Sequence, residues 1–365
     1  MIVIISSNHF PDDERIYHKQ IKSLTKVGKK VLYITRSTNQ INLSDDYVNH
    51  QNFDLSQNSF IKKIKSILIK KDNVTHLQIH ETNLLLLIRF IKLLKPSIIT
   101  IYDVHEDMVS LYRTFTKRTK LISEVSIFFR KKKEEKFLKF VDRIILANPT
   151  IKKDRYGKFK IEQIILENFP EKKYIVNSLR NRVNKPFIIY HGHLAPERGI
   201  SDLIVAMGDV IKVEPKAKLT LLGSFRTRKF KKEIFKLIKI NSLEKHIRID
   251  SQIPHKEVWG VLKKHSIGVI PFRRNPLTEN NTPTKLFEMM ASGLEIIATD
   301  LPPVKYFLNK SIFWANAGSP FSIGTNLLTA IKNLELQSNL EINLKLVNKK
   351  YNWESIESKY LSIFK

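Results

Sequence analysis

The sequence contains no cysteine among its 365 residues. This absence excludes disulfide bonds, zinc sites built on thiolates and a cysteine nucleophile. No apolar run reaches the roughly 18 residues that a membrane-spanning helix needs. The first residues also lack the charged segment and the long apolar stretch of a signal peptide. We therefore expect the chain to be cytoplasmic.

Acidic residues are scarce relative to basic ones. The chain has 63 Lys and Arg against 35 Asp and Glu, which gives a formal charge of +28. Such a charge attracts polyanions, either nucleic acid or an anionic membrane surface. A compositional bias toward Lys, Ile and Asn, as an AT-rich genome imposes, explains the same excess. The charge alone does not decide between them, and without a recognisable nucleic-acid-binding motif we expect no nucleic acid partner.

Short apolar runs alternate with longer helical patterns along the whole chain, and this predicts an α/β fold with parallel sheets covered on both faces. One helix is expected at residues 14–27, where apolar side chains recur at helical spacing before Gly28. The strands expected in the first half are residues 1–5, 31–35, 76–80, 98–102, 143–147 and 161–166. Those expected in the second half are residues 187–191, 218–222, 246–250, 268–271 and 295–298.

The alternation weakens at residues 168–185, which contain a proline and a charged stretch, and then restarts. We interpret this zone as a linker between two doubly wound, Rossmann-like domains. Ligands of such sheets bind at the carboxyl ends of the strands. Functional residues are therefore expected just after strands. The predicted division is residues 1–170, a linker at 171–186, a second domain at 187–345, and a C-terminal helix at 346–365 that returns to the first domain.

Two segments of the second half have the composition of an anion site. Residues 192–200 read Gly-His-Leu-Ala-Pro-Glu-Arg-Gly-Ile and lie between an expected strand and an expected helix, where free amide groups and Arg198 suit a phosphate. Residues 283–293 read Pro-Thr-Lys-Leu-Phe-Glu-Met-Met-Ala-Ser-Gly. Lys285 and Glu288 there share one helix face. Each segment also has an explanation without a ligand. Arg198 would be a solvated arginine in a turn, and Lys285 and Glu288 would form a surface ion pair.

Together the two segments resemble glycosyltransferase family 4, the large group 1 family of GT-B fold. Its members show G-x-L-x-x-x-(K/R)-G-I before a helix and, later, P-x-K-x-x-E-x-x-A-x-G. Asp13-Glu-Arg15 is similar to the family's first helix, Tyr102-Asp-Val-His-Glu106 to its D-x-H-E strand end, and Asn352-Trp-Glu354 to the start of its last helix. The resemblance implies two Rossmann-like domains that face each other across a cleft.

The resemblance also implies roles for individual residues. Arg198 and Lys285 would neutralise the donor diphosphate, and Glu288 would hold the ribose hydroxyls. His105 would face the transferred sugar. Leu286 and Phe287 would offer backbone amides to the donor. The implied sets are Gly192, His193, Arg198, Lys285, Leu286, Phe287 and Glu288 for donor binding, His105, Glu288 and Asn280 for catalysis, and Ser7, Asn8, His9, Asp12, Asp13 and Arg15 for acceptor binding.

Two positions depart from the family pattern. Many members have glutamates eight residues apart, but Asn280 stands eight before Glu288 and Glu279 is one step off. The usual glycine–arginine pair is Gly192-His193, so one phosphate-binding cation is missing. A protonated His193 would replace it, and donor affinity would then fall above roughly pH 6.5.

The resemblance implies the activity of a retaining, hexosyltransferase-type glycosyltransferase. It would move a sugar from a nucleoside diphosphate sugar to a glycan or polyisoprenoid-linked acceptor in bacterial cell-surface polysaccharide biosynthesis. No metal or other cofactor is expected. A sugar-nucleotide epimerase of related fold and a non-catalytic, polyanion-binding member of the family remain open alternatives.

A further segment bears on location. Residues 60–71 form an amphipathic helix pattern with five lysines. Such helices lie in a membrane interface or pack on a core with a solvated face, and both interpretations stay open. The first gives a peripheral position at the inner face of the plasma membrane, with an anionic membrane surface as a partner.

Overall fold

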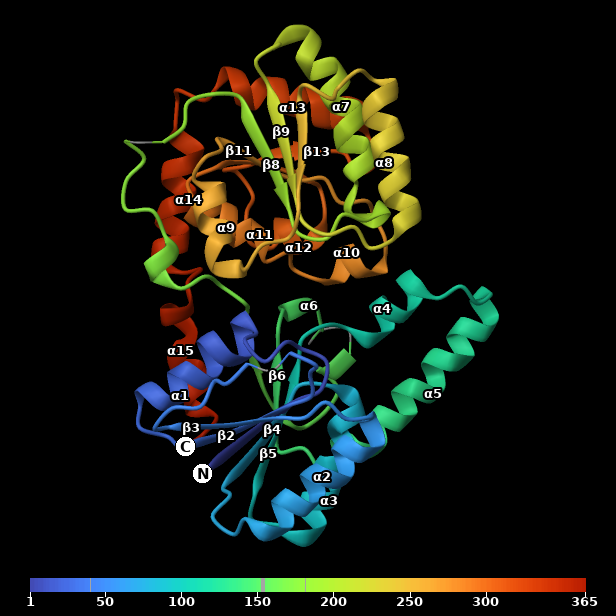
Figure 1. Cartoon of the computed structure of the whole chain (residues 1–365), viewed down its shortest axis with the longest axis vertical. Helices are drawn as coiled ribbons and strands as arrows, with labels where there is room; N and C mark the ends of the chain where they lie inside the picture. Colours follow the sequence, from blue (N-terminus) through green and yellow to red (C-terminus); the bar gives the residue numbers. More distant parts are fainter. Residues whose placement is uncertain (40, 152–154, 181) are drawn as a thin grey trace. The chain divides into compact units, whose positions relative to one another are not determined.

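The computed structural model describes residues 1–39, 41–151, 155–180 and 182–365. The chain folds into two compact units. The first comprises Met1–Asn168 and Ile356–Lys365, and the second comprises Phe169–Ser355. Each unit is built on one parallel sheet with helices (Figure 1). The α/β fold expected from the alternation of strands and helices is therefore confirmed.

The sheet of the first unit has seven parallel strands in the order β3-β2-β1-β4-β5-β6-β7. Six were predicted from apolar runs. The seventh, β3, has the sequence VNHQN, which carries one buried apolar residue and gives no strand signal. The strands are β1 (Ile2–Ser6), β2 (Val31–Thr35), β3 (Val48–Asn52), β4 (His76–Ile79), β5 (Ile99–Val104), β6 (Arg143–Leu146) and β7 (Glu162–Ile165).

Both faces of this sheet are covered, which explains why its central strands are continuously apolar. Val3 and Ile5 of β1 belong to a core cluster with apolar residues of α2 and α3. The expected helix at residues 14–27 begins as a π-helix and continues as α1. The helical segments are η1 (Glu14–Ile21), α1 (Lys22–Lys26), α2 (Gln57–Lys70), η2 (Thr82–Leu84), α3 (Leu85–Leu94), α4 (Met108–Phe115), α5 (Lys120–Leu138) and α6 (Pro149–Ile151).

The sheet of the second unit has six parallel strands in the order β10-β9-β8-β11-β12-β13. Five were predicted, and the three-residue edge strand β13 was too short to be recognised. They are β8 (Phe187–His191), β9 (Lys218–Leu222), β10 (Ile247–Asp250), β11 (Ile267–Ile270), β12 (Glu295–Thr299) and β13 (Phe313–Ala315). In both sheets the chain order reverses beside the first strand, so the carboxyl ends of β1 and β8 lie at switch points that favour ligand binding.

Helices complete the second unit, and the last one runs into the first unit from Ile356 onward. Within the described residues, no helix combines the length and the apolar character needed to cross a membrane. The segments are η4 (Lys172–Tyr174), η5 (Pro196–Arg198), α7 (Ile200–Val213), α8 (Arg228–Ile240), α9 (His255–Leu262), α10 (Pro276–Asn280), α11 (Lys285–Ala291), α12 (Pro302–Lys305), α13 (Pro320–Lys332), α14 (Ser338–Lys349) and α15 (Trp353–Ser362).

The unit boundaries differ from the division expected from the sequence. The expected linker, residues 171–186, belongs to the second unit, as does α14. Its described residues pack there: Val176 N donates to Ala291 O at 2.9 Å, and Arg182 Nη1 donates to Leu334 O at 2.8 Å. Just before the segment, the Phe169 ring lies 4.6 Å from that of Phe287. The proline and the charges that suggested a linker thus mark a segment that packs on the second unit.

Candidate active site

The first motif forms a tight turn between β8 and α7. Gly192 has a φ of +107° and Gly199 one of +68°. A Cβ at Gly199 would lie 1.6 Å from the carbonyl oxygen of Pro271, so only glycine fits. A Cβ at Gly192 would lie 3.3 Å from Lys285 Nζ. The glycine of the first motif thus lets the lysine of the second approach the backbone, although the two are far apart in sequence.

Arg198 and Lys285 meet at one aromatic ring. The guanidinium carbon of Arg198 lies 4.5 Å, and Lys285 Nζ 4.7 Å, from the ring centre of Phe272. Lys285 Nζ also lies 5.2 Å from the ring centre of Tyr190. The aromatic faces stabilise two cations that would otherwise repel each other. The expected pairing of these residues as an anion site is consistent with this geometry.

Lys285 carries a strongly shifted pKa. Burial and the neighbouring charge of Arg198 lower the pKa of its ammonium from 10.5 to about 7, and Glu288 only partly offsets them. An anion beside this lysine would favour the charged form. The electrostatics therefore indicate a site that is short of negative charge in the free protein.

Glu288 lies between two histidines that neither sequence motif marks as site residues. His255 Nε2 lies 2.8 Å from Glu288 Oε1, and His191 Nε2 lies 3.2 Å from Oε2. Burial opposes ionisation of Glu288, but the His255 hydrogen bond and the adjacent positive groups lower its pKa to about 2. Burial lowers the pKa of His191 to about 4. Glu288 is thus an oriented carboxylate, and of its two partners only His191, at the end of a predicted strand, had a signal in the sequence.

A further cation near the first motif was also missed. Arg226 follows β9, its backbone N donates to Leu194 O at 3.1 Å, and its side chain pairs with Glu197. Burial and the charges of Arg226, Arg198 and Lys285 lower the pKa of His193. His193 in the free protein therefore loses its proton below the ordinary value, which corrects the expected pH of roughly 6.5. Arg226, after a strand next to β8, occupies the region where the expected arginine is missing.

Two expected donor contacts are corrected by the hydrogen bonds of α11. The amides of Leu286 and Phe287 already donate to Pro283 O and Thr284 O, both at 3.0 Å. Both side chains are buried. These residues therefore form the core beneath the site and do not offer free amides. Asn280, the last residue of α10, donates from Nδ2 to Pro276 O at 2.9 Å within its own helix.

In the first unit, an unexpected carboxylate organises the loop after β1. Glu81 is 8% exposed and accepts hydrogen bonds from Ser7 N at 3.0 Å and Asn8 N at 2.9 Å. Its Oε1 also lies 3.0 Å from His9 Nδ1. Burial lowers the pKa of His9, but the Glu81 hydrogen bond and nearby carboxylates outweigh it and raise that pKa. Glu81 follows β4, the neighbour of β1, and this position after a predicted strand is the sequence signal that could have marked it.

Three of the expected acceptor residues have structural roles. Arg15 is buried and forms an ion pair with Asp103, with Nη2–Oδ1 3.0 Å, while Nη1 donates to Leu166 O. Asp13 caps η1 by accepting from the Arg15 and Ile16 amides. Ser7 is 1% exposed. The assignment of Ser7 and Arg15 to acceptor binding is corrected, because both side chains are buried. Asp13 is partly exposed and uses only Oδ1 for the cap, so its assignment stays a prediction. Asn8 and Asp12 are exposed and His9 is partly exposed, so these three stay candidates.

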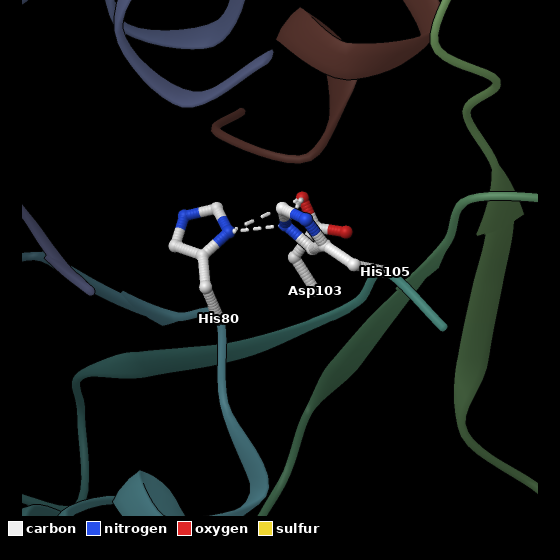
Figure 2. Close-up of side chains that lie close together, drawn as sticks. All are labelled: His80, Asp103 and His105. Carbon is white, nitrogen blue, oxygen red and sulfur yellow. Dashed lines mark hydrogen bonds and ion pairs between the residues drawn. The ribbon is translucent and has the colours of Figure 1, made fainter. Parts of the chain in front are cut away.

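His105 is held by a chain of hydrogen bonds (Figure 2). His80 Nδ1 lies 2.8 Å from His105 Nε2. Gln78 Nε2 lies 3.1 Å from His80 Nε2. An amide nitrogen only donates, so His80 accepts at Nε2 and donates from Nδ1. His105 therefore accepts at Nε2 and carries its proton on Nδ1. The centre of the His9 ring lies 4.4 Å from that of His105, which places His105 at the partly exposed end of this chain.

His80, Asp103 and His105 also lie within the distances of a metal site. Their existing bonds do not favour one. Asp103 accepts from Gln20 at 2.6 Å and from Arg15 through both oxygens. The facing nitrogens of the two histidines are hydrogen-bonded to each other. A metal would have to displace these partners beside a buried guanidinium, which is electrostatically costly.

Comparisons with known proteins bear on the fold and on the family of the second unit. Residues 171–347 match the family model described as glycosyl transferases group 1. A comparison with curated proteins gives no match. A sucrose-phosphate synthase from Thermosynechococcus elongatus superposes with a TM-score of 0.78 at 15% identity, over 100% of this chain and 98% of that one.

Two further solved structures have the same fold. HepE of Anabaena in complex with UDP-glucose has a TM-score of 0.74 at 11% identity, with 99% of each chain covered. A mutant TarM of S. aureus in complex with Fondaparinux, alpha-GlcNAc-glycerol and UDP has a TM-score of 0.68 at 13% identity, with both chains covered completely. Residues 171–347 are therefore similar to the group 1 glycosyltransferases, and the chain has the fold of the GT-B glycosyltransferases.

Proposed function

We propose that this chain is a retaining hexosyltransferase that uses a nucleoside diphosphate sugar and serves bacterial cell-surface polysaccharide biosynthesis. The observation that carries the proposal is the convergence of Arg198 and Lys285 on the Phe272 ring, with the held carboxylate of Glu288 in the first turn of the same helix as Lys285. Cations suit a diphosphate, and an ionised carboxylate suits sugar hydroxyls. The diphosphate and the hydroxyl groups of a nucleotide sugar thus both have binding partners in one part of the second unit.

In this proposal the second unit binds the donor. Arg198, Lys285 and Arg226 neutralise the diphosphate, whose negative charge increases as the bond to the sugar breaks. Fixed positive groups aimed at a charge that develops in the transition state are an effective source of catalysis. The lowered pKa of Lys285 supports this role, because the departing diphosphate gives the lysine the counter-charge that it lacks. This arrangement needs no metal ion, and we propose a metal-independent reaction.

We assign recognition of the nucleoside to Glu288. A carboxylate has about four lone-pair positions, of which the hydrogen bond with His255 uses one, so Glu288 retains capacity to accept from ribose hydroxyls. The HepE structure holds UDP-glucose, and we propose a uracil nucleotide as the first donor to be tested. Asn280 remains proposed as a contact to the transferred sugar.

The first unit is proposed to bind the acceptor, a glycan or a polyisoprenoid-linked sugar. Asn8, His9 and Asp12 offer polar groups at the carboxyl end of β1. His105 presents Nδ1–H as a donor to a sugar hydroxyl, since its Nε2 accepts from His80. We propose the cytoplasm as the location, at the inner face of the plasma membrane where a lipid-linked acceptor is met.

A donor panel with purified protein tests this function. The expected result is release of the nucleoside diphosphate from one nucleotide sugar, with transfer to a polyisoprenoid-linked acceptor and an unchanged anomeric configuration by NMR. An epimerase would instead change the sugar while it stays attached to the nucleotide, or release it with the configuration of another sugar. Absence of both turnover and binding across the panel would contradict the donor site and favour a non-catalytic member.

A further inference from the structure

The helices α4 and α5 form an arm of the first unit. In Figure 1 they extend away from the sheet, and α5 runs back along the unit toward α2 and α3. Arg113 of α4 and Glu124 of α5 join the two helices through paired contacts of 2.8 and 2.9 Å. The arm thus presents one face to its own unit and leaves the other face of α5 uncovered.

The uncovered face of α5 is apolar where a solvated helix should be polar. Leu121, Ile122, Val125, Phe128 and Phe129 are between 50% and 76% exposed. Their spacing of three and four residues places them on one stripe of the helix. The opposite stripe faces the unit and consists of Ser123, Ile127, Glu134 and Leu138, all buried. The exposed apolar residues therefore cannot be explained as part of the core.

Cations border this stripe at both ends. Between residues 117 and 136 the sequence has eight basic residues against three acidic ones. Of the acidic residues, Glu124 is paired with Arg113 and Glu134 is buried beside Arg155. Glu135 is paired with Lys158 at 2.7 Å and lies 3.7 Å from Lys132. The exposed bordering cations are Lys117, Arg118 and Lys120 before the stripe and Lys132, Lys133 and Lys136 after it. We name these six cations and the five apolar residues together the α5 surface.

The helix first considered for membrane contact has the opposite arrangement. In α2 the apolar residues Phe60, Ile61, Ile64 and Leu68 are buried in the core of the first unit. Its lysines Lys62, Lys63 and Lys70 face solvent, as on an ordinary surface helix. The apolar face of α2 is therefore not available to lipid, whereas that of α5 is already exposed.

We propose that the α5 surface docks on an anionic lipid membrane, with its apolar side chains inserted at the level of the lipid headgroups. Aromatic and aliphatic side chains bordered by lysines are the composition of interfacial helices, which combine apolar burial with attraction to anionic lipids. A second copy of this chain is a poorer occupant, because it would bring two cationic borders together in a chain of formal charge +28. Charge complementarity thus favours lipid.

This docking rests on the membrane location of the proposed function and assigns that location to one helix. Vesicle binding is measured without donor or acceptor, so its outcome is independent of whether the chain transfers a sugar. Failure of docking would leave the donor site unaffected, and failure of transfer would leave docking unaffected.

Three matched variants separate this surface from general charge attraction. The first replaces Leu121, Val125 and Phe129 by Gln, and the second replaces Lys120, Lys132 and Lys133 by Gln. The control replaces Lys62, Lys63 and Lys70 of α2 by Gln, which removes the same charge elsewhere. All substituted side chains are exposed, so thermal unfolding by circular dichroism should show all three variants folded.

Flotation with vesicles of phosphatidylcholine and phosphatidylglycerol gives the partition coefficient of each protein. We expect the two α5 variants to bind at least about tenfold more weakly, and the α2 control to bind within about twofold of the wild type. Equal losses in the α2 and α5 charge variants would overturn the proposal in favour of bulk attraction. Wild type that ignores the vesicles, or that forms a dimer lost in the apolar variant, would overturn it as well.

Insertion itself can be measured because the chain has no cysteine. Phe128→Cys labelled with an environment-sensitive dye should shift to shorter emission wavelength on vesicle binding. The same label at Ser66→Cys, an exposed position of α2, should not shift. Equal behaviour of the two labels would contradict docking through α5.

Discussion

His255 Nε2 lies 2.8 Å from Glu288 Oε1, so the first residue of α9 holds a carboxylate in the first turn of α11. His191, at the end of β8, lies 3.2 Å from the other oxygen. Three elements from separate parts of the sequence therefore fix one charged group. A carboxylate held in one orientation suits selective recognition of hydroxyl groups, and this property can be tested directly.

Glu288→Gln should reduce the preference for ribose over deoxyribose. The wild type is expected to bind UDP more tightly than 2′-deoxy-UDP by about 1.5–3 kcal/mol, since a hydrogen bond to a charged group contributes about that much. In the variant the difference should largely disappear, as calorimetry would show. The control Glu279→Gln, which alters an exposed carboxylate on α10, should keep the difference in affinity between UDP and 2′-deoxy-UDP. Unchanged discrimination in Glu288→Gln would refute the assignment.

Replacing each cation of the donor site by Ala should weaken nucleotide binding. We expect Arg198→Ala and Lys285→Ala to lose about 2–3 kcal/mol, or about 30- to 150-fold, because each removes a charged contact to the diphosphate. Arg226→Ala should also weaken UDP binding if this arginine replaces the missing one. Lys212→Ala, an exposed lysine of α7, is the control. Calorimetry with UDP that gives wild-type affinity for the first two variants would exclude the site.

Donor affinity should fall as the pH rises through neutrality. The folded-state pKa of Lys285 is lowered to about 7, so its ammonium is present below that pH and is lost above it. UDP-glucose is the suitable probe, because its diphosphate does not titrate in this range. The bound diphosphate raises the lysine pKa, which extends the fall to higher pH.

Lys285→Arg provides the control for this pH dependence, since arginine stays charged throughout. The fall above neutrality should then flatten, leaving a dependence at lower pH that belongs to His193. The same slope in Lys285→Arg as in the wild type would show that another group titrates.

Arg15→Met should destabilise the first unit. The ion pair with Asp103 is buried, and removal of one partner leaves a buried charge uncompensated, at a cost of about 3–5 kcal/mol. Urea unfolding followed by circular dichroism should show the loss. Asp12→Asn, at an exposed position, should change the stability by less than about 0.5 kcal/mol. A stable Arg15→Met variant with weakened acceptor binding would restore the role that the sequence assigned.

Transfer should persist in EDTA, because the charge that a metal would offset is met by side chains in this proposal. The measurement is nucleotide release before and after chelation. Activity that EDTA abolishes and that magnesium or manganese restores would contradict the proposed mechanism, and His80, Asp103 and His105 would then be the first ligands to examine.

The architecture, and the residues of the donor site that we propose, could be predicted from local sequence patterns. Apolar runs of four to six residues indicated eleven of the thirteen strands that the structure describes, because a strand buried on both faces must be apolar throughout. The two motifs indicated Arg198, Lys285 and Glu288, since each position combines a glycine turn or helix start with a charged side chain. Local pattern was sufficient there because the chemistry lies within a few residues of the signal.

Long-range packing determines which polar groups have a partner. Local sequence patterns do not predict this packing. His255 and Arg226 come from elements remote in sequence, and no local pattern distinguishes them from solvated residues. Arg15 is the opposite case. Its motif suggested that the guanidinium contacts a ligand, but the guanidinium is paired with Asp103, 88 positions later. Exposure follows the same rule: α2 and α5 are both amphipathic and basic, but packing buries the apolar face of one and leaves that of the other uncovered. Hydrophobic periodicity specifies that a face exists, whereas the tertiary fold determines what covers it.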